Sequence, residues 1–389
     1  MVPGQYQKAA GEVYRQCLRC VMDTSDPDIR FDAEGHCNHC STFLSDTIYK
    51  TYLGPETDKV LQALVAKIKK KGRGKAYDCV LGISGGADSC YAAYCCSNLG
   101  LRVLLVHVDN GWDTTTSVDN IRALCNGLGL DYVSRVLPWE DFKEIQVSHL
   151  RASVPEMESP TDIALLEELH KVAAEYGVSY IISGGNYITE GILPKSWHYN
   201  AKDKKFAKAI HAKFGRRSVK YFPSFDFLKE AYYKFWKGIK MVYLLNYLPF
   251  NKTKAIETLQ TLGWKRYGEK HHESFYTRMV QAYILPKKFN IDYRKATLST
   301  KICTGEITRA EALRRLAQAT YDEATIASDI NYVCKKLGLQ PEEFEAMMQS
   351  QVLSYKDYPN DEFRLTVLYG AYSRLFAGQK RNNQKSMFS

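Results

Sequence analysis

The sequence predicts an α/β fold built on a doubly wound, mostly parallel sheet. Apolar runs of strand length occupy residues 77–83, 101–108, 131–136 and 178–182, and helical segments separate them. Buried parallel strands are continuous apolar runs of this kind, and strands that alternate with helices favour right-handed crossovers. Two of the runs end in glycine-rich turns, which we expect at the same edge of the sheet.

The chain of 389 residues is long enough for two or three domains. We expect an N-terminal segment over 1–57, the sheet domain over 58–194, and a basic, aromatic and mainly helical region over 195–389. The many aromatic residues of 227–250 favour a helix whose aromatic stripe is buried, with a helix on a membrane surface as the alternative. Ordinary hydrophobic (45%) and charged (25%) fractions exclude disordered and collagen-like chains.

The location of the protein is predicted from its apolar segments and its cysteines. The first sixteen residues contain no apolar run, and the most apolar stretch, 241–250, is about half the length of a membrane span. The eleven cysteines are odd in number and mostly scattered, which favours a reducing compartment over a disulfide framework. We therefore expect a cytoplasmic protein without a membrane span.

Two C-x-x-C pairs near the N-terminus predict a zinc knuckle. Sixteen residues separate Cys17 and Cys20 from Cys37 and Cys40. Each pair can present two thiolates to one ion, and two pairs complete a tetrahedron. His36 and His39 are alternative ligands. Because four thiolates leave no open position, the predicted zinc is structural.

The glycine-rich turn after the first apolar run predicts a phosphate site. Residues 84–89 read Ser-Gly-Gly-Ala-Asp-Ser and precede a helix. A strand, a glycine turn and a helix point backbone N–H groups at an anion. The turn lacks the Gly-Lys-Ser/Thr of a Walker loop and is not G-x-G-x-x-G. The second turn, 183–191, reads Ser-Gly-Gly-Asn-Tyr-Ile-Thr-Glu-Gly and should face the same crevice.

Charge and polar residues mark the C-terminal half. The net charge of the chain is +10, and residues 195–220 alone carry +8, which indicates an anionic partner. Further on, Lys270-His-His-Glu273 forms a dense polar cluster. Its spacing disfavours a metal site, so we expect it to bind a phosphate or carboxylate, or to transfer a proton.

In this order, the paired cysteines, residues 84–89, 183–191, 270–274 and the 305–313 segment Gly-Glu-Ile-Thr-Arg-Ala-Glu-Ala-Leu resemble the N-acetyl sugar amidotransferase family. That family belongs to the PP-loop ATP pyrophosphatases, with an adenine nucleotide alpha hydrolase-like fold, and acts in bacterial surface-polysaccharide and flagellin-glycan biosynthesis. The resemblance runs from about residue 14 to about residue 317. It implies that ATP adenylylates the acetamido oxygen of a nucleotide-linked amino sugar or its uronic acid, and that ammonia then forms an acetamidino group.

The resemblance also implies site residues. Asp88 would help to hold Mg²⁺ and serve catalysis together with the polar cluster Lys270, His271, His272 and Glu273. The implied ATP contacts are Ser84, Gly85, Gly86, Asp88, Ser89, Asp109, Gly184, Gly185, Asn186 and Glu190. The implied substrate contacts are Lys195, His198 and Arg278. The implied zinc ligands are Cys17, Cys20, Cys37 and Cys40.

Ammonia is scarce at neutral pH, and the chain shows no glutaminase motif: residue 2 is valine, which excludes an N-terminal cysteine nucleophile. The resemblance therefore implies a separate glutaminase and a cyclase-like subunit as partners, whereas nucleic acid is an unexpected one. The alternative is a PP-loop tRNA sulfurtransferase, since some of those enzymes also begin with cysteine knuckles. Against it, Cys125, Cys303 and Cys334 each lack a C-x-x-C mate. A non-enzymatic zinc adaptor is a third possibility, which the intact 84–89 turn disfavours.

Overall fold

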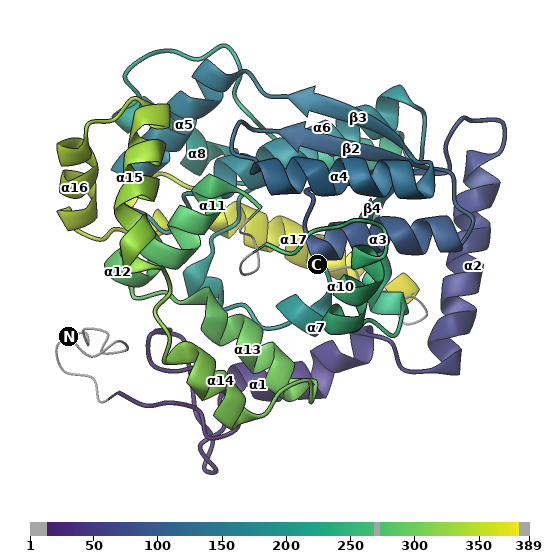
Figure 1. The fold of residues 1–389 in the computed structure, drawn as a ribbon, viewed down its shortest axis with the longest axis horizontal. Coiled ribbons are helices and arrows are strands. Elements are labelled where there is room, and N and C mark those ends of the chain that lie inside the picture. Colours follow the sequence, from purple (N-terminus) through teal and green to yellow (C-terminus); the bar gives the residue numbers. More distant parts are fainter. Residues whose placement is uncertain (1–13, 268–272, 381–389) are drawn as a thin grey trace.

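The computed structural model describes residues 14–267 and 273–380, with side chains as far as residue 371. A sheet of five parallel strands lies at the centre of these residues, in the order β3-β2-β1-β4-β5 (Figure 1). Its strands are β1 (Cys79–Gly82), β2 (Val103–Asp109), β3 (Asp131–Val136), β4 (Tyr180–Ser183) and β5 (Lys240–Tyr243). The strand order reverses between β1 and β4, which defines a doubly wound sheet and its crevice. The predicted fold class is confirmed.

Side chains that alternate along the strands build a core on each face of the sheet. Leu81 pairs with Leu105 and points to one face, while Val80 pairs with Leu104 and points to the other. All four side chains are buried. In contrast, β3 is an edge strand and leaves Val136 72% exposed. The apolar runs therefore form the middle of the sheet, as expected for parallel strands.

Helices cover both faces of the sheet. α3 packs on β1, β2 and β4, and α4 and α10 pack against α3. In contrast, α6 packs on the opposite face. The helices up to residue 260 are α1 (Asn38–Thr42), α2 (Pro55–Gly72), α3 (Ala87–Asn98), α4 (Thr115–Leu128), α5 (Trp139–Arg151), α6 (Ser159–Glu175), α7 (Tyr187–Glu190), α8 (Lys204–Phe214), α9 (Phe227–Ala231) and α10 (Lys252–Gln260). Short 3₁₀ or π turns occupy Phe43–Thr47, Ile48–Lys50, Lys195–Trp197, Tyr232–Trp236, Leu244–Tyr247, Val280–Ile284 and Tyr355–Asp357.

The prediction of a continuous helix over 227–250 is wrong. α9 and a π turn end at Trp236, and β5 follows as the edge strand beside β4. Gly238 has a φ of +67°, which ends the helical segment. The β-branched Ile239 and Val242 that follow suit a strand better than a helix, and both are buried against the sheet. The sheet consequently extends beyond the predicted boundary at residue 194.

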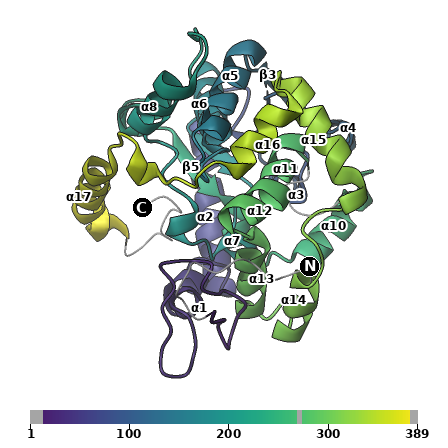
Figure 2. The same cartoon turned by 90° about the vertical axis from the view of Figure 1, so that its left-hand side faces the viewer.

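The C-terminal helices form a second body with the N-terminal segment, beside the sheet (Figures 1 and 2). Its core includes Trp112, Met157, Tyr276 and Val280, all buried, together with the cysteines of the N-terminal segment. The helices are α11 (Phe275–Met279), α12 (Leu285–Phe289), α13 (Tyr293–Cys303), α14 (Arg309–Leu316), α15 (Glu323–Leu337) and α16 (Pro341–Gln349). The last helix, α17 (Glu362–Lys380), packs instead near α9, where Tyr369 contacts Phe227 (Figure 2). Among the described helices, none combines the length and the apolar character that a bilayer crossing needs.

Buried polar contacts dock the N-terminal segment onto α13 and α14. Arg309 donates to the carbonyls of Cys17 and Cys20 at 3.0 Å each. Lys295 and Asp23 form an ion pair at 2.6 Å, with side chains 4% and 1% exposed. These contacts explain the 305–313 motif in part, because its arginine holds the cysteine knuckle.

We expect Lys295→Met to lower the free energy of unfolding by about 3–5 kcal/mol, because the mutation leaves Asp23 buried without its cation. The matched control is Lys59→Met, which removes a lysine from the exposed pair with Glu56 and should have no measurable effect. Urea unfolding followed by circular dichroism compares the two variants. Equal stability of both variants would contradict the role assigned to the buried pair.

Candidate active site

The 84–89 turn has the geometry of an anion-binding loop. Gly85 adopts φ +80°, and the loop closes on itself through Ser84 and Ser89, whose hydroxyl oxygens lie 3.2 Å apart. The backbone N–H of Gly86 donates to the Ser84 hydroxyl at 3.3 Å. α3 begins at Ala87 without a side-chain cap, which leaves its first N–H groups for a bound anion.

Two side chains that the sequence analysis missed hold this loop through hydrogen bonds to the Gly85 carbonyl. The Gly85 carbonyl accepts hydrogen bonds from Trp264 Nε1 at 3.0 Å and Asn120 Nδ2 at 3.3 Å. Asn120 is itself buried in α4, and its oxygen accepts from the Lys265 backbone N–H at 2.7 Å. No local motif marks Trp264 or Asn120, so only their proximity in the fold identifies them.

The second glycine turn lies directly against the first. A Cβ atom on Gly184 would lie 2.7 Å from the backbone of Ser89, so only glycine permits this approach. The two turns therefore meet at the crevice between β1 and β4.

The side chain of Asn186 stabilises the second turn by hydrogen bonds within it. It is fully buried, its oxygen caps α7 by accepting from Thr189 N–H at 2.9 Å, and its amide donates to the Gly184 carbonyl at 3.2 Å. Glu190 accepts from the Asn186 backbone N–H at 3.3 Å. Both side chains were predicted to contact a nucleotide. The structure shows them holding the turn, while Gly184 packs against Ser89 and Gly185 against the Tyr243 ring.

Asp109 ends β2 and stabilises the loop that follows it, accepting from Gly111 N–H at 2.8 Å. Lys336 of α15 donates to the Gly111 carbonyl and lies 4.9 Å from the Trp112 ring centre and 5.3 Å from that of Trp139. The C-terminal body thus fixes the loop in which Asp109 was predicted to meet a nucleoside.

Glu273 is brought to the 84–89 loop by backbone pairing. Its carbonyl accepts from Thr114 N–H, and Phe275 N–H donates to the Trp112 carbonyl, both at 3.0 Å. The Glu273 carboxylate accepts from the Ser84 hydroxyl at 3.4 Å. The other members of the predicted catalytic cluster, Lys270, His271 and His272, lie outside the described residues.

Lys252 is a further residue that the sequence analysis missed. It begins α10 and forms an ion pair with Asp88 at 3.2 Å, with side chains 18% and 15% exposed. A cation at the mouth of a phosphate loop can neutralise a bound polyphosphate, and the oxygen donors of Asp88 suit Mg²⁺. The signal in the sequence is weak, since Lys252 lies among several surface lysines.

The three predicted substrate contacts are not brought together. Arg278 binds both carboxylate oxygens of Asp329 at 2.8 Å, whereas Lys195 and His198 are exposed beyond the second turn. Acidic residues also pair with much of the 195–220 segment. The pairs are Lys202–Glu230, Lys204–Asp226, Lys205–Asp361, Arg216–Glu343 and Arg217–Asp141. The local charge of +8 is therefore largely compensated within the fold.

The four N-terminal cysteines form a buried cluster suited to a metal. Their sulfurs all lie within 4.8 Å of one another, and each residue is 0% exposed. The Sγ atoms of Cys17 and Cys40 are 3.7 Å apart, and those of Cys20 and Cys37 are 3.5 Å apart. Tetrahedral zinc with Zn–S bonds of about 2.3 Å places its sulfurs about 3.8 Å apart, so the donor set fits zinc.

The surroundings of the cluster favour a thiolate at Cys17. Backbone N–H groups of Cys20 and Cys37 donate to Cys17 Sγ at 3.4 and 3.1 Å. Hydrogen bonds from Cys20 and Cys37 lower the pKa of the Cys17 thiol to about 6. His36 and His39, the alternative ligands, bind elsewhere: His36 contacts Arg19 at 2.6 Å, and His39 pairs with Asp26.

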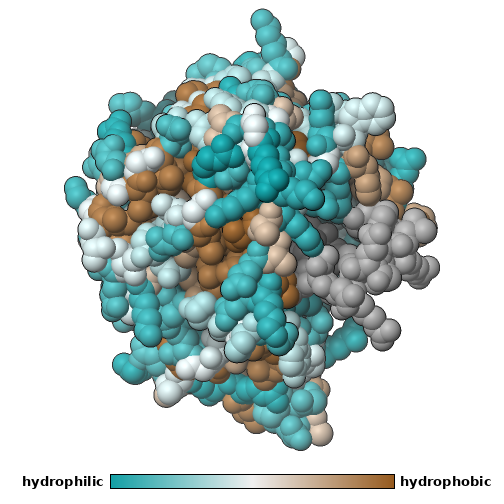
Figure 3. All heavy atoms as spheres, turned by 90° about the vertical axis from the view of Figure 1, so that its right-hand side faces the viewer, coloured by the Kyte–Doolittle hydropathy of each residue, from teal (hydrophilic) through white to brown (hydrophobic). Residues whose placement is uncertain are grey.

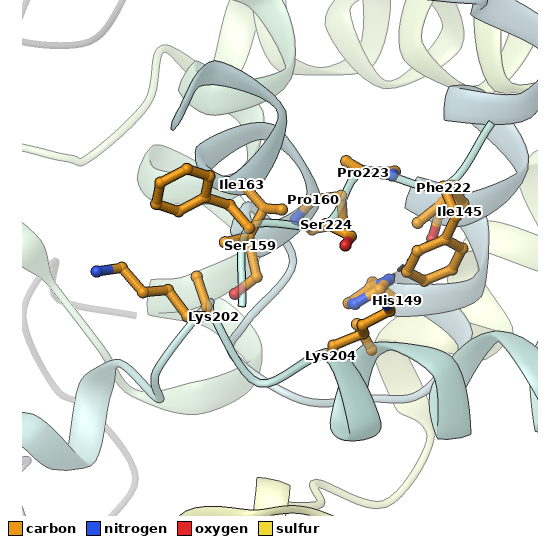
Figure 4. Close-up of a pocket in the computed structure, with 13 residues that line it drawn as sticks. Ile145, His149, Ser159, Pro160, Ile163, Lys202, Lys204, Phe222, Pro223 and Ser224 are labelled. Carbon is orange, nitrogen blue, oxygen red and sulfur yellow. Dashed lines mark hydrogen bonds between the residues drawn. The ribbon is translucent and has the colours of Figure 1, made fainter. Parts of the chain in front are cut away.

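Two cavities lie on the α6 side of the sheet. The larger, about 190 Å³, reaches Tyr243, whose ring lies against Gly185 of the second turn. The smaller, about 20 Å³, has room for about one water molecule (Figure 4). His149 Nε2 and Ser224 Oγ line the small cavity and have no hydrogen-bond partner among the described residues. Burial lowers the pKa of His149 to about 4, so the ring is neutral at pH 7.

Comparisons with known proteins bear on the C-terminal body. Residues 273–371 match the family described as "LPS biosynthesis protein WbpG-like, C-terminal domain". We call residues 273–371 the WbpG-like segment, after the family to which they are similar. The match agrees with the surface-polysaccharide biosynthesis that the resemblance drawn from the sequence implies. The WbpG-like segment begins at Glu273, the residue that reaches the 84–89 loop.

Among solved structures, an NH3-dependent NAD synthetase from Campylobacter jejuni has 16% identity over 73% of this chain and 97% of its own, with a TM-score of 0.30. The U34-tRNA thiolase NcsA from Methanococcus maripaludis, with its [4Fe-4S] cluster, has 15% identity over 78% of this chain and 89% of its own, with a TM-score of 0.33. Among curated proteins, none matches this chain.

We expect Gly85→Ala to abolish nucleotide binding, since its Cβ would lie 2.3 Å from the Ser117 carbonyl oxygen and force the loop to move. Gly177→Ala is the control, because Gly177 also has a positive φ (+64°) but no atom within 4 Å of its Cβ position. Gly177→Ala should retain binding and cost about 1–2 kcal/mol of stability at most. Calorimetric titration with ATP measures both variants, and full binding by Gly85→Ala would argue against the loop.

We expect metal analysis of the purified chain to find one zinc ion per molecule, and Cys20→Ser to lose it and to unfold at a lower temperature. A matched control is Cys334→Ser, which changes a buried cysteine outside the cluster and should keep the metal. Iron together with a visible absorption band would show an iron–sulfur cluster and contradict the zinc assignment.

Proposed function

We propose that the chain is an ATP-dependent amidotransferase that converts an acetamido group of a nucleotide-linked amino sugar, or of its uronic acid, into an acetamidino group. The observation that carries this proposal is the contact of Glu273 with Ser84. It places the start of a segment similar to a lipopolysaccharide-biosynthesis family on an anion-binding loop. The product would enter bacterial surface-polysaccharide or O-antigen biosynthesis.

The reaction has two steps. The amide oxygen attacks the α-phosphate of ATP, which forms an O–P bond and breaks the bond to pyrophosphate. Ammonia then attacks the activated carbon, AMP leaves with the former amide oxygen, and the nitrogen loses a proton. In the first step the 84–89 loop and the N-terminus of α3 would hold the departing pyrophosphate, and Lys252 would balance its charge.

The acidic residues of the site supply the remaining roles. Asp88, whose carboxylate lies beside Lys252, would help to hold Mg²⁺, which screens the phosphate charge when bound. Glu273 is positioned to accept the proton that the attacking nitrogen loses. His271, His272 and Lys270 are proposed to complete this cluster. Lys195, His198 and Arg278 are retained as proposed substrate contacts only, since the described residues do not bring them together.

Ammonia would come from a glutaminase and a cyclase-like subunit, because the chain shows no glutaminase motif of its own. We expect the purified chain to use ammonium salts and to be inactive with glutamine. Equal rates with glutamine and ammonium would contradict the need for these partners.

The tRNA sulfurtransferase alternative has less support. Its chemistry uses a pair of reactive cysteines, and outside the cluster only Cys125 and Cys303 are even partly exposed. Cys303 contacts Cys40, which raises the pKa of the Cys303 thiol and disfavours a reactive thiolate. The basic segment that would attract tRNA is paired with acidic residues. Tight binding of bulk tRNA with a steep salt dependence would favour the alternative.

We expect Asp88→Ala and Ser84→Ala to lose activity by at least about a hundredfold without unfolding, because each removes a group from the phosphate loop. Glu273→Gln should lower turnover while ATP binding is retained, as expected for a proton acceptor. The assay is mass spectrometry of the products from nucleotide-linked diacetamido sugars with ATP and ammonium chloride. Lys59→Gln, on the surface of α2, is the control variant. Unchanged rates in Asp88→Ala would overturn the assignment of the loop.

A further inference from the structure

An exposed aromatic ridge leads into the edge strand β5. It consists of Leu228, Tyr232, Phe235 and Trp236, which are 75%, 46%, 57% and 82% exposed. Large apolar side chains that gather at this degree of exposure mark interaction sites more often than ordinary surface. The sequence analysis favoured a buried aromatic stripe here, and the structure contradicts it for Tyr232, Phe235 and Trp236.

The ridge is exposed because the opposite side of the same segment anchors it. Tyr233 stacks on Phe225 with ring centres 5.9 Å apart and packs on His170 at 5.2 Å, and Phe227 packs against Tyr369 of α17 at 5.5 Å. Asp226 caps α9 by accepting from the Lys229 backbone N–H at 3.0 Å. The four-residue spacing from Leu228 to Tyr232 to Trp236 keeps these three on one side of the helical segment. The ridge is therefore a rigid projection of the fold.

Positive charge accompanies the ridge. Residues 231–245 contain no acidic residue, and two of their lysines, Lys237 and Lys240, are exposed. The acidic residues just before them, Asp226 and Glu230, already have cations: Asp226 pairs with Lys204, and Glu230 pairs with Lys202 at 2.8 Å. The surface around the exposed aromatic side chains is consequently basic.

We propose that this aromatic ridge is a peripheral membrane contact that inserts Phe235 and Trp236 among the headgroups of an anionic lipid surface. Aromatic rings prefer the boundary between headgroups and acyl chains, and nearby lysines are attracted to anionic lipid. An anionic bilayer is favoured over a folded partner because exposed aromatic side chains and exposed lysines occur together here, and residues 231–245 contain no acidic residue. Figure 3 shows one face of the molecule, on which apolar side chains lie between hydrophilic ones.

Trp236 gives the proposal a specific reporter. Of the five tryptophans, Trp112, Trp197 and Trp264 are buried and Trp139 is partly buried, so Trp236 alone is largely exposed. We expect vesicles of phosphatidylglycerol and phosphatidylcholine, in a roughly 3:7 ratio, to shift the tryptophan emission of the full chain to the blue. Phosphatidylcholine vesicles should have little effect, and raising the salt from about 50 to about 500 mM should weaken the binding.

Substitutions distinguish vesicle binding through the ridge from non-specific adsorption to vesicles. Phe235→Gln with Trp236→Gln should weaken co-sedimentation with the anionic vesicles at least tenfold, and Lys237→Gln with Lys240→Gln should reduce both the affinity and its salt dependence. Trp236→Phe should keep the binding but lose the blue shift. The control is Tyr132→Gln, which removes an aromatic side chain 44% exposed on β3, the opposite edge of the sheet, and should bind as the parent does.

The proposal is overturned by absence of binding to anionic vesicles at low salt, or by equal binding of the Phe235→Gln, Trp236→Gln variant. It is also overturned if the parent protein does not bind vesicles and the ridge variants instead lose self-association or the binding of a glutaminase subunit. Circular dichroism melting confirms that the variants are folded. The amidotransferase assay is independent of this test, because soluble sugar nucleotides are used without vesicles.

Discussion

The organisation of this protein depends on how one backbone carbonyl is held. The Gly85 carbonyl accepts from Trp264 and Asn120, and this fixes the loop whose N–H groups face the crevice. A glycine turn alone has many conformations, and its entropy would oppose the binding of an anion. Two donors from distant parts of the chain select one conformation before any ligand arrives, which is the preorganisation that electrostatic stabilisation requires.

The C-terminal body completes the site as well as covering it. Backbone pairing of Trp112 and Thr114 with Phe275 and Glu273 joins the end of β2 to the WbpG-like segment. Lys336 fixes the same loop from α15. The N-terminal cysteine cluster is in turn held by Arg309 of α14. Successive contacts thus connect the cysteine cluster, the C-terminal helical body and the 84–89 loop. Loss of a metal from the cluster should therefore disturb the conformation of that loop.

The basic residues of 195–220 form ion pairs mainly with acidic residues of the same chain. The basic segment that first indicated an anionic partner pairs with acidic residues of α5, α9 and α16 and with Asp361, just before α17, and these pairs connect the segment to those elements. Exposed pairs of this kind contribute little stability individually. Exposed lysines, Lys237 and Lys240, also lie beside the aromatic ridge, where the structure leaves apolar side chains in solvent.

The sequence by itself determined what is local: four of the five strands, both glycine turns, and the spacing of the four cysteines. Apolar runs, glycine pairs and C-x-x-C motifs are short-range signals of backbone conformation and ligand geometry. Only the tertiary structure decided that Asn186 supports its turn, that Lys252 meets Asp88, that β5 joins the sheet, and that Trp236 is exposed. These outcomes depend on contacts between residues far apart in the chain or on which side of a short helix faces the core, and no local pattern encodes either.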